Sequence, residues 1–177
     1  MKEIAFLNPE NVSKEELKMY EVREATRGVV LDEKNNVALL HATKTDYYKL
    51  PGGGLDADTD KIVALKRECR EEIGCVVEVL GEIGLVNEWR RFCKLHQISY
   101  CYLAKVISTK ETPNLTESEV AEGFEAVWLP HNEALDVLKG SKAEKIEAKE
   151  YIVPRDIAIL EASRDALFQI LKTRRMD

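Results

Sequence analysis

The sequence predicts a layered fold of the α/β or α+β class. Two observations support this prediction. Strand-like segments rich in apolar and β-branched residues dominate the middle of the chain, and segments with helical spacing of apolar residues flank them. The size agrees, because 177 residues, of which 45% are hydrophobic, can form one full core. We therefore expect a single domain over residues 1–177.

The first third of the chain predicts a short helix and then a hairpin. Ser13-Lys-Glu-Glu16 has the spacing of a capping box, which favours a helix near residues 14–19. Thr26–Leu31 and Val37–His41 are apolar and rich in β-branched residues. Turn-forming Asp and Asn residues separate these two runs, so we expect them to pair as a hairpin.

A glycine-rich loop and an amphipathic helix come next. Pro51-Gly-Gly-Gly54 predicts a loop, and a helical pattern runs from about Asp60 to Ile73, with Gly74 at the position of a C-terminal glycine. A rotation of ~100° per residue places four apolar residues on one narrow stripe, which should face the core. These residues are Ile62, Leu65, Cys69 and Ile73.

The second half of the chain predicts three strands and three helices. The expected strands are Val76–Val86, Leu95–Val106 and Phe124–Leu129, with a polar loop over Thr109–Gly123. The expected helices are His131–Lys139, Ser141–Tyr151 with a capping box at its start, and about Arg155–Lys172 after an interruption at Pro154.

Composition and charge exclude several classes of protein. The formal net charge of −6 argues against general binding of nucleic acids or of anionic membranes. The apolar run Ile4–Leu7 is too short for a signal peptide, and no run reaches the ~18 apolar residues of a membrane span. The four cysteines form no Cys-x-x-Cys pair, which is typical of buried thiols in a reducing compartment. We expect a soluble, cytoplasmic protein.

Three carboxylates share one arc of the helix that follows the glycine-rich loop. Glu68, Glu71 and Glu72 stand at positions i, i+3 and i+4, and like charges at this spacing destabilise a helix. A solvated acidic face is one interpretation. The other is a site for Mg²⁺ or Mn²⁺, because these cations prefer oxygen ligands. A phosphate chain could approach the adjacent glycines closely.

The segment from Gly53 to Cys75 resembles the Nudix box, G-x5-E-x7-R-E-U-x-E-E-x-G-U, in which U is an apolar residue. Its matching positions are Gly53, Arg67, Glu68, Cys69, Glu71, Glu72, Gly74 and Cys75. The resemblance extends over about residues 22–172 and leaves residues 1–21 as an N-terminal extension. It implies an α/β/α sandwich with a central mixed β-sheet.

The resemblance also implies roles for individual residues. Glu68, Glu71 and Glu72 would bind Mg²⁺ or Mn²⁺ together with the carbonyl of Gly52, and one of the glutamates would orient or deprotonate the attacking water. Arg67 would be an electrostatic anchor and completes the expected catalytic set. The acidic segment before Trp128 supplies two further candidates for a ligand or base, with a solvated loop as the alternative. They are Glu119 and Glu122.

One position departs from the family pattern. The first glutamate of the box, which supports the box arginine, falls on Thr59. Thr59 can cap the helix instead, and Asp58 or Asp60 can pair with Arg67. The departure bears on the full catalytic rate more than on the existence of the site.

Substrate contacts are expected at the glycine-rich loop and on the nearby strands. Gly53 and Gly54 would let a phosphate chain approach, Tyr48 could stack on a base, and Arg27 could meet a phosphate. For Tyr48 the plain alternative is a half-buried strand aromatic, and for Arg27 it is a surface charge.

The resemblance therefore predicts a divalent-metal-dependent hydrolase. It would cleave the pyrophosphate linkage of a nucleoside diphosphate linked to another moiety, with a nucleoside triphosphate or an oxidised nucleotide as the favoured substrate. The alternatives are a ligand-sensing module on the same scaffold and a non-hydrolytic relative such as an isoprenoid diphosphate isomerase. The expected partner is a nucleotide-like small molecule. The segments before residue 22 and after about residue 140 could form a homodimer contact or a lid.

Overall fold

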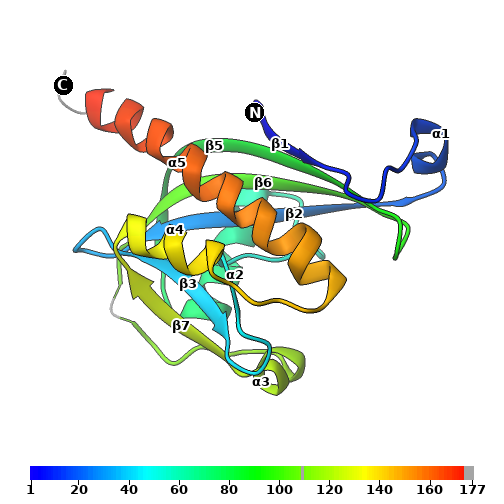
Figure 1. The fold of residues 1–177 in the computed structure, drawn as a ribbon. Coiled ribbons are helices and arrows are strands. Elements are labelled where there is room, and N and C mark those ends of the chain that lie inside the picture. The colour runs from blue at the N-terminus through cyan, green and yellow to red at the C-terminus, as the bar shows by residue number, and fades with distance from the viewer. Residues whose placement is uncertain (109, 174–177) are drawn as a thin grey trace.

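A central mixed β-sheet lies between two layers of helices in the computed structural model of the protein (Figure 1). The structure describes residues 1–108 and 110–173, with side chains as far as Phe168. The strands are β1 (Glu3–Leu7), β2 (Glu21–Leu31), β3 (Val37–Ala42), β4 (Tyr47–Lys49), β5 (Val77–Arg90), β6 (Leu95–Val106) and β7 (Phe124–Leu129). The helices are α1 (Lys14–Leu17), α2 (Lys61–Ile73), α3 (Glu117–Glu122), α4 (His131–Lys139), the π-helical turn η1 (Ala148–Ile152) and α5 (Val153–Thr173). The fold class predicted from the sequence is confirmed.

The sheet combines parallel and antiparallel pairings. Its strands follow the order β1-β5-β6-β2-β3-β4, and β7 pairs with β3. The pairs β1–β5 and β2–β6 are parallel, whereas β2–β3, β3–β4, β3–β7 and β5–β6 are antiparallel. Strand β2 pairs with β6 in one register from Glu21–Leu95 to Leu31–Lys105, so it runs through the middle of the sheet.

Neighbouring residues of the central strands pack on opposite faces of the sheet. Val29 and Leu39 belong to the core cluster beneath α4 and α5, whereas Val30 and Leu40 belong to the cluster beneath α2. This alternation follows from the pleat of a strand. Because helices cover both faces, the central strands are apolar on both sides.

The buried face of α2 differs from the predicted stripe. Leu65, Cys69 and Ile73 are buried as expected, but Ile62 is 37% exposed. The inward face also includes the glutamates at positions 68 and 72, so it is rotated toward them, and Ile62 falls at its rim. The core and the acidic arc therefore overlap instead of lying on separate sides of the helix.

Three short elements were missing from the sequence prediction. β1 joins the sheet as an edge strand beside β5, and β4 pairs with β3. The expected loop over Thr109–Gly123 contains the helix α3. A capping box of Thr116 and Glu119 begins α3, and this spacing is a signal that the sequence offered.

The expected helix over Ser141–Tyr151 is confirmed only from residue 146, because residues 141–145 are not helical, and the expected break at Pro154 is wrong. The Ser141 hydroxyl donates to the carbonyl of Val137 and accepts the Tyr48 N–H, so it does not cap a helix. η1 runs directly into α5, and Pro154 lies inside the helical segment. The π-helical turn changes the hydrogen-bond register just before the residue that has no N–H to donate.

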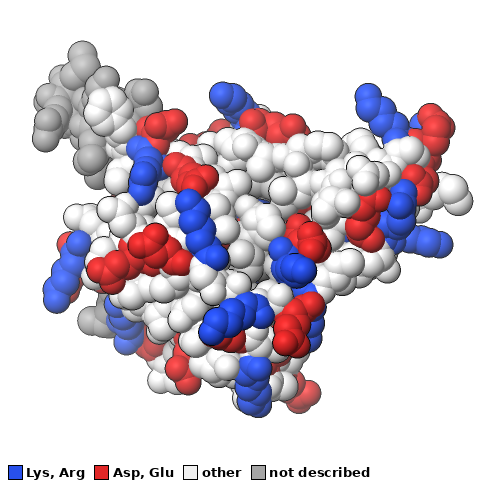
Figure 2. All heavy atoms as spheres, viewed as in Figure 1, with Lys and Arg blue, Asp and Glu red and all other residues white. Residues whose placement is uncertain are grey.

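Surface properties agree in part with the expectations. Cys69, Cys75 and Cys101 are buried, but Cys93 is exposed, because it lies in the turn between β5 and β6. Figure 2 shows acidic and basic side chains interspersed on one face of the molecule rather than separated by sign. Among the described residues, no helix is both long and apolar enough to cross a membrane.

The glycine-rich loop is fastened to β2 by backbone hydrogen bonds. The N–H of Thr26 donates to the carbonyl of Gly53 at 2.9 Å, and the N–H of Gly28 donates to Pro51 at 3.0 Å. Gly52 has a φ of +131°, and a Cβ there would overlap the carbonyl oxygen of Thr26. The loop can approach β2 this closely only because Gly52 has no side chain.

Asp60, not Thr59, caps the N-terminus of α2. The Asp60 carboxylate accepts the N–H groups of Ile62 and Val63 at 2.7 and 3.2 Å. The cap role expected for Thr59 is therefore wrong. Gly74 ends the helix as predicted.

We predict that Asp60→Ala lowers the free energy of unfolding by about 1 kcal/mol, because two N–H groups lose their acceptor. Thr59→Ala is the matched control and should change it by less than about 0.5 kcal/mol. Urea denaturation followed by circular dichroism measures both. A larger loss in Thr59→Ala than in Asp60→Ala would contradict this assignment of the cap.

Candidate active site

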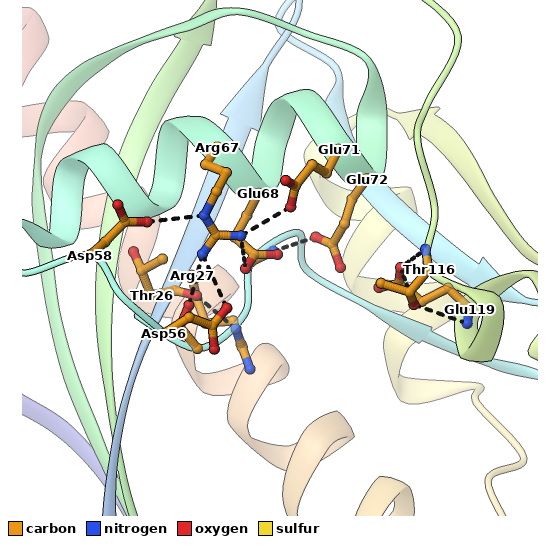
Figure 3. Close-up of polar contacts among 12 residues, drawn as sticks. Thr26, Arg27, Asp56, Asp58, Arg67, Glu68, Glu71, Glu72, Thr116 and Glu119 are labelled. Atoms are coloured by element: carbon orange, nitrogen blue, oxygen red, sulfur yellow. Dashed lines mark hydrogen bonds and ion pairs between the residues drawn. The ribbon is translucent and has the colours of Figure 1, made fainter.

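Arg67 joins α2 to the loop that precedes it (Figure 3). Its Nε donates to Asp58 at 3.0 Å, and its Nη1 donates to Glu68 at 2.9 Å and to Glu71 at 3.0 Å. Its Nη2 donates to the carbonyl of Gly54 at 3.1 Å. Burial opposes the charge of Arg67, but the hydrogen bonds to the three carboxylates raise its pKa. The guanidinium is therefore held as a fixed cation.

Asp58 supplies the carboxylate that the box lacks at Thr59. The family pattern places a glutamate at position 59 to support the arginine, and the Asp58 carboxylate reaches Arg67 from the preceding position. Asp56 adds a longer contact of 3.4 Å from an exposed side chain. Of the two expected partners, Asp58 pairs with Arg67, and Asp60 serves as the cap instead.

Glu68 is buried under the glycine-rich loop. A Cβ at Gly53 would overlap the Glu68 carboxylate, so the glycine provides the space that this side chain occupies. Burial raises the pKa of Glu68, although the charge of Arg67 lowers it.

Glu72 binds both the loop and a lysine. Its carboxylate accepts the Gly52 N–H at 2.6 Å and the Lys49 ammonium at 2.8 Å, and the residue is 2% exposed. Burial raises the pKa of Glu72 to about 6, although Lys49 and the Gly52 N–H favour the charged form. Sequence reasoning did not find Lys49, although this residue directly precedes Leu50-Pro51.

The Lys49 ammonium lies between carboxylates of two helices. It is 2.8 Å from Glu72 of α2, 3.8 Å from Glu119 of α3, and 4.6 Å from the centre of the Phe124 ring. Burial opposes ionisation of Glu119, but hydrogen bonds from the N–H and hydroxyl of Thr116 and the charge of Lys49 lower its pKa. A cation thus already occupies the space between these two glutamates.

Glu122 is held on the other side of α3. It accepts the Tyr47 hydroxyl at 3.3 Å and the Lys145 ammonium at 2.6 Å. Of the two further candidates, Glu119 is the one that faces Glu72 through Lys49.

The acidic arc does not converge as the sequence predicted. In residues 1–108 and 110–173, no three His, Cys, Asp or Glu side chains are grouped so that they could hold a metal ion. Because like charges repel, each glutamate of the arc pairs with a cationic side chain instead. Arg67 forms ion pairs with Glu68 and Glu71, and Lys49 forms one with Glu72.

The donor set nevertheless fits a hard cation chemically. Glu68, Glu71, Glu72 and Glu119 offer oxygen ligands, which Mg²⁺ and Mn²⁺ prefer. The carbonyls on either side of Gly52 bond to β2, whereas the Gly52 carbonyl accepts no hydrogen bond from the part of the chain that the structure describes. The position of the Lys49 ammonium shows that a positive charge is accommodated beside Glu72.

A pocket of about 410 Å³ brings most of these residues together. Gly52, Gly53 and Gly54 line it with Glu68, Glu72 and Glu119, and three arginines also contribute to its wall. The arginines are Arg23, Arg27 and Arg155. Glu122 also lines the pocket, whereas Glu71 does not; its side chain is 42% exposed and contacts Arg67.

The two expected substrate contacts outside the glycine-rich loop differ in their placement. Tyr48 stacks on His41 with ring centres 4.2 Å apart and packs against the core. It is therefore a half-buried strand aromatic, and its neighbour Tyr47 lines the pocket instead. Arg27 is not a surface charge, because it is buried and lines the pocket.

Arg155 and Asp156 are two further residues near the pocket that were not predicted from the sequence. Both are buried at the start of α5, and the Asp156 carboxylate accepts the Leu50 N–H at 2.8 Å. A signal was present: each stands four residues before a core position, Ile159 and Leu160, so a helix places the charged pair on its inward face.

The fold and the site define an α/β/α protein in which an acidic helix packs against a glycine-rich loop. The family model for the NUDIX domain matches residues 22–152, which is more than half of the chain. The chain therefore belongs to the Nudix family.

Individual relatives agree with this assignment. An RNA pyrophosphohydrolase of Ruthia magnifica subsp. Calyptogena magnifica is 34% identical over 64 residues, and the match spans 36% of each chain. A NUDIX hydrolase from Nitrosomonas europaea has a TM-score of 0.63 at 14% identity, covering 82% of this chain and 90% of that one. The MutT protein from Methanosarcina mazei Go1 has a TM-score of 0.54 at 17% identity, covering 84% and 97%. The two structures share the fold.

We predict that Asp58→Ala lowers the free energy of unfolding by roughly 1 kcal/mol, because Arg67 loses a charged hydrogen bond in a partly exposed setting. Asp56→Ala, which removes only the longer contact, should cost less than about 0.5 kcal/mol.

Thr59→Glu in the Asp58→Ala background should recover part of the loss, because it returns a carboxylate to the family position. Urea denaturation of the wild type, Asp56→Ala, Asp58→Ala and the double variant Asp58→Ala plus Thr59→Glu measures these free energies of unfolding. Equal effects of Asp56→Ala and Asp58→Ala, with no recovery, would show that Asp58 does not replace the family glutamate.

Proposed function

We propose that the protein is a divalent-metal-dependent hydrolase of the pyrophosphate linkage in a nucleoside diphosphate linked to another moiety. A nucleoside triphosphate or an oxidised nucleotide is the favoured substrate. The main support is the pocket that joins the buried carboxylates of Glu68 and Glu72, the glycine-rich loop and Arg27. A pyrophosphate group carries charges that one wall of cations can bind, while the carboxylates hold a metal ion.

Glu68, Glu71 and Glu72 would hold Mg²⁺ or Mn²⁺ together with the Gly52 carbonyl, and Glu119 is the favoured further ligand or base. When bound, such a cation neutralises charge on the bridging oxygen and lowers the pKa of a coordinated water. Glu122 is less suited, because Lys145 and Tyr47 already occupy its carboxylate.

The remaining residues of the site would position the carboxylates and bind the substrate. Arg67 fixes the orientation of Glu68 and Glu71 relative to the loop through its hydrogen bonds. Gly53 and Gly54 line the pocket, where a phosphate chain would meet them, and Arg27 supplies a positive charge. Lys49 adds a second positive charge beside Glu72.

A ligand-sensing module without significant hydrolysis is the second candidate. One observation favours it, because the glutamates of the arc are paired with Arg67 and Lys49 instead of converging. The departure at Thr59 counts less in its favour, since Asp58 contacts Arg67 in its place. A single-domain organisation, a cytoplasmic location and a homodimer stay predictions.

The double variant Glu71→Gln plus Glu72→Gln should reduce kcat at least about a hundredfold, because neutral amides bind a divalent cation poorly and water activation depends on that charge. Glu125→Gln, on the exposed part of β7, is the matched control and should retain full turnover. Phosphate or pyrophosphate release measures kcat, and far-UV circular dichroism checks the fold. A folded double variant with wild-type turnover would refute the assigned site.

A substrate panel separates the two candidate functions. Release of phosphate or pyrophosphate would be measured with unmodified and oxidised nucleoside triphosphates, ADP-ribose, diadenosine polyphosphates and nucleotide sugars, each with Mg²⁺ and with EDTA. We expect turnover of triphosphates that EDTA abolishes. If no compound turns over while the folded protein binds one of them, the sensing module is the better description.

A further inference from the structure

Two buried arginines line the pocket together with the glutamates. Arg27 of β2 is 7% exposed and Arg155 of α5 is 1% exposed, and both line the pocket. In Figure 3 the Arg27 side chain extends away from α2, in the direction of α5. Two guanidinium groups thus line the same pocket, close enough for the charge of one to act on the other.

The charge of Arg27 is not balanced by a direct partner. Its Nη1 donates to the carbonyl of Thr26 at 2.7 Å, and its Nε is buried without a hydrogen-bond partner. In the part of the chain that the structure describes, no carboxylate forms an ion pair with it. Burial, and then the charge of Arg155, lower the pKa of Arg27 to about 10, although nearby carboxylates act in the opposite direction. A buried cation in this setting destabilises the folded protein.

Arg155 is fixed in place but keeps one weakly engaged nitrogen. Its Nε and Nη2 donate to the Asp156 carboxylate at 2.7 and 3.2 Å. The carboxylate nearest to Nη1 belongs to Glu88, at 4.0 Å, and Arg90 already donates to it at 3.1 Å. Asp156 also accepts the Leu50 N–H, which connects this arginine to the start of the glycine-rich loop.

We propose that Arg27 and Arg155 form an anion subsite that binds the terminal phosphate of the substrate. The proposal rests on the proposed function and narrows its substrate class. A terminal phosphate carries nearly two charges at pH 7, whereas each phosphate of a diphosphate diester carries one. Two guanidinium groups that line one pocket suit the former, because planar guanidinium groups pair well with phosphate oxygens. Substrates with a terminal phosphate are therefore preferred over ADP-ribose and nucleotide sugars.

This subsite lies partly beyond the region that the family model matches. That region ends at residue 152, and Arg155 follows it in the first turn of α5. The preference for a terminal phosphate would then come from the packing of α5 on β2.

Inorganic pyrophosphate in EDTA is the direct probe, because no metal is then needed for binding. Isothermal titration calorimetry of the wild type should show binding that Arg27→Met weakens at least tenfold. Arg91→Met, which alters an exposed arginine bound to Glu16, is the control and should bind like the wild type. Arg27→Met should also melt at the same temperature as the wild type or higher, because an unbalanced buried charge is removed. A large fall in melting temperature with unchanged binding would make Arg27 structural and overturn the proposal.

Arg155→Lys gives an independent test, because it retains the charge but loses the paired donors. It should weaken pyrophosphate binding, and in the presence of Mg²⁺ it should lower kcat/KM for a triphosphate at least tenfold more than for ADP-ribose. Equal effects on both substrates would overturn the subsite even if hydrolysis is confirmed. Binding of pyrophosphate that depends on Arg27, without turnover of any substrate, would support the subsite while the proposed hydrolase fails.

Discussion

The guanidinium of Arg67 is the contact on which the rest of the site depends. It bonds at once to the loop carbonyl of Gly54, to Asp58 and to two glutamates of α2. Glu72 fastens the same loop from the other side through the Gly52 N–H. Without these bonds the loop would still be held by its backbone pairing to β2 and by the Leu50 N–H on Asp156, but the carboxylates of α2 would have no fixed relation to it. One arginine therefore sets the distance between the acidic helix and the backbone of the pocket.

The pocket gathers charged side chains of both signs. Acidic and basic side chains are interspersed on the face in Figure 2, and the pocket is lined by glutamates together with Lys49 and three arginines. The Lys49 ammonium lies between carboxylates of α2 and α3, whereas Arg27 forms no ion pair with a carboxylate among the described residues. The charge of Arg155 beside Arg27 costs free energy, because like charges repel in a low-dielectric interior. Under the proposed function, a phosphate chain would offset the charge of these arginines, and an acidic protein would thereby take an anionic ligand.

Sequence patterns predicted the elements in which apolar residues recur at a regular spacing and missed elements too short to show such a spacing. Periodicity located β7 and α4 correctly, and the box located α2. β4 has three residues, too few for a period to show. The inward rotation of α2 could not be foreseen, because burial of Glu68 and Glu72 depends on the loop that covers them.

The residues of the candidate site were likewise predicted only in part. The spacing of the box identified Arg67 and the glutamates, since these lie on one continuous segment. Lys49 and Arg155 come from β4 and α5, and only the folded chain brings them to the pocket. Glu72 pairs with one of these distant residues, Lys49, whereas Glu68 and Glu71 pair with Arg67 of the box itself.

The π-helical turn η1 sets the phase of α5. Tyr151 within η1 and Arg155 after it are both fully buried, so the same side of the chain faces inward across the junction. A π turn holds one residue more per hydrogen bond than an α turn. Removing that residue would rotate the helix that follows by about 100° relative to the anchored tyrosine. Arg155 would then leave the pocket, and the Leu50 N–H would lose Asp156 as its acceptor. Single-residue deletions within 148–151 are therefore a route by which related chains could lose or change the proposed anion subsite without altering any residue that lines it.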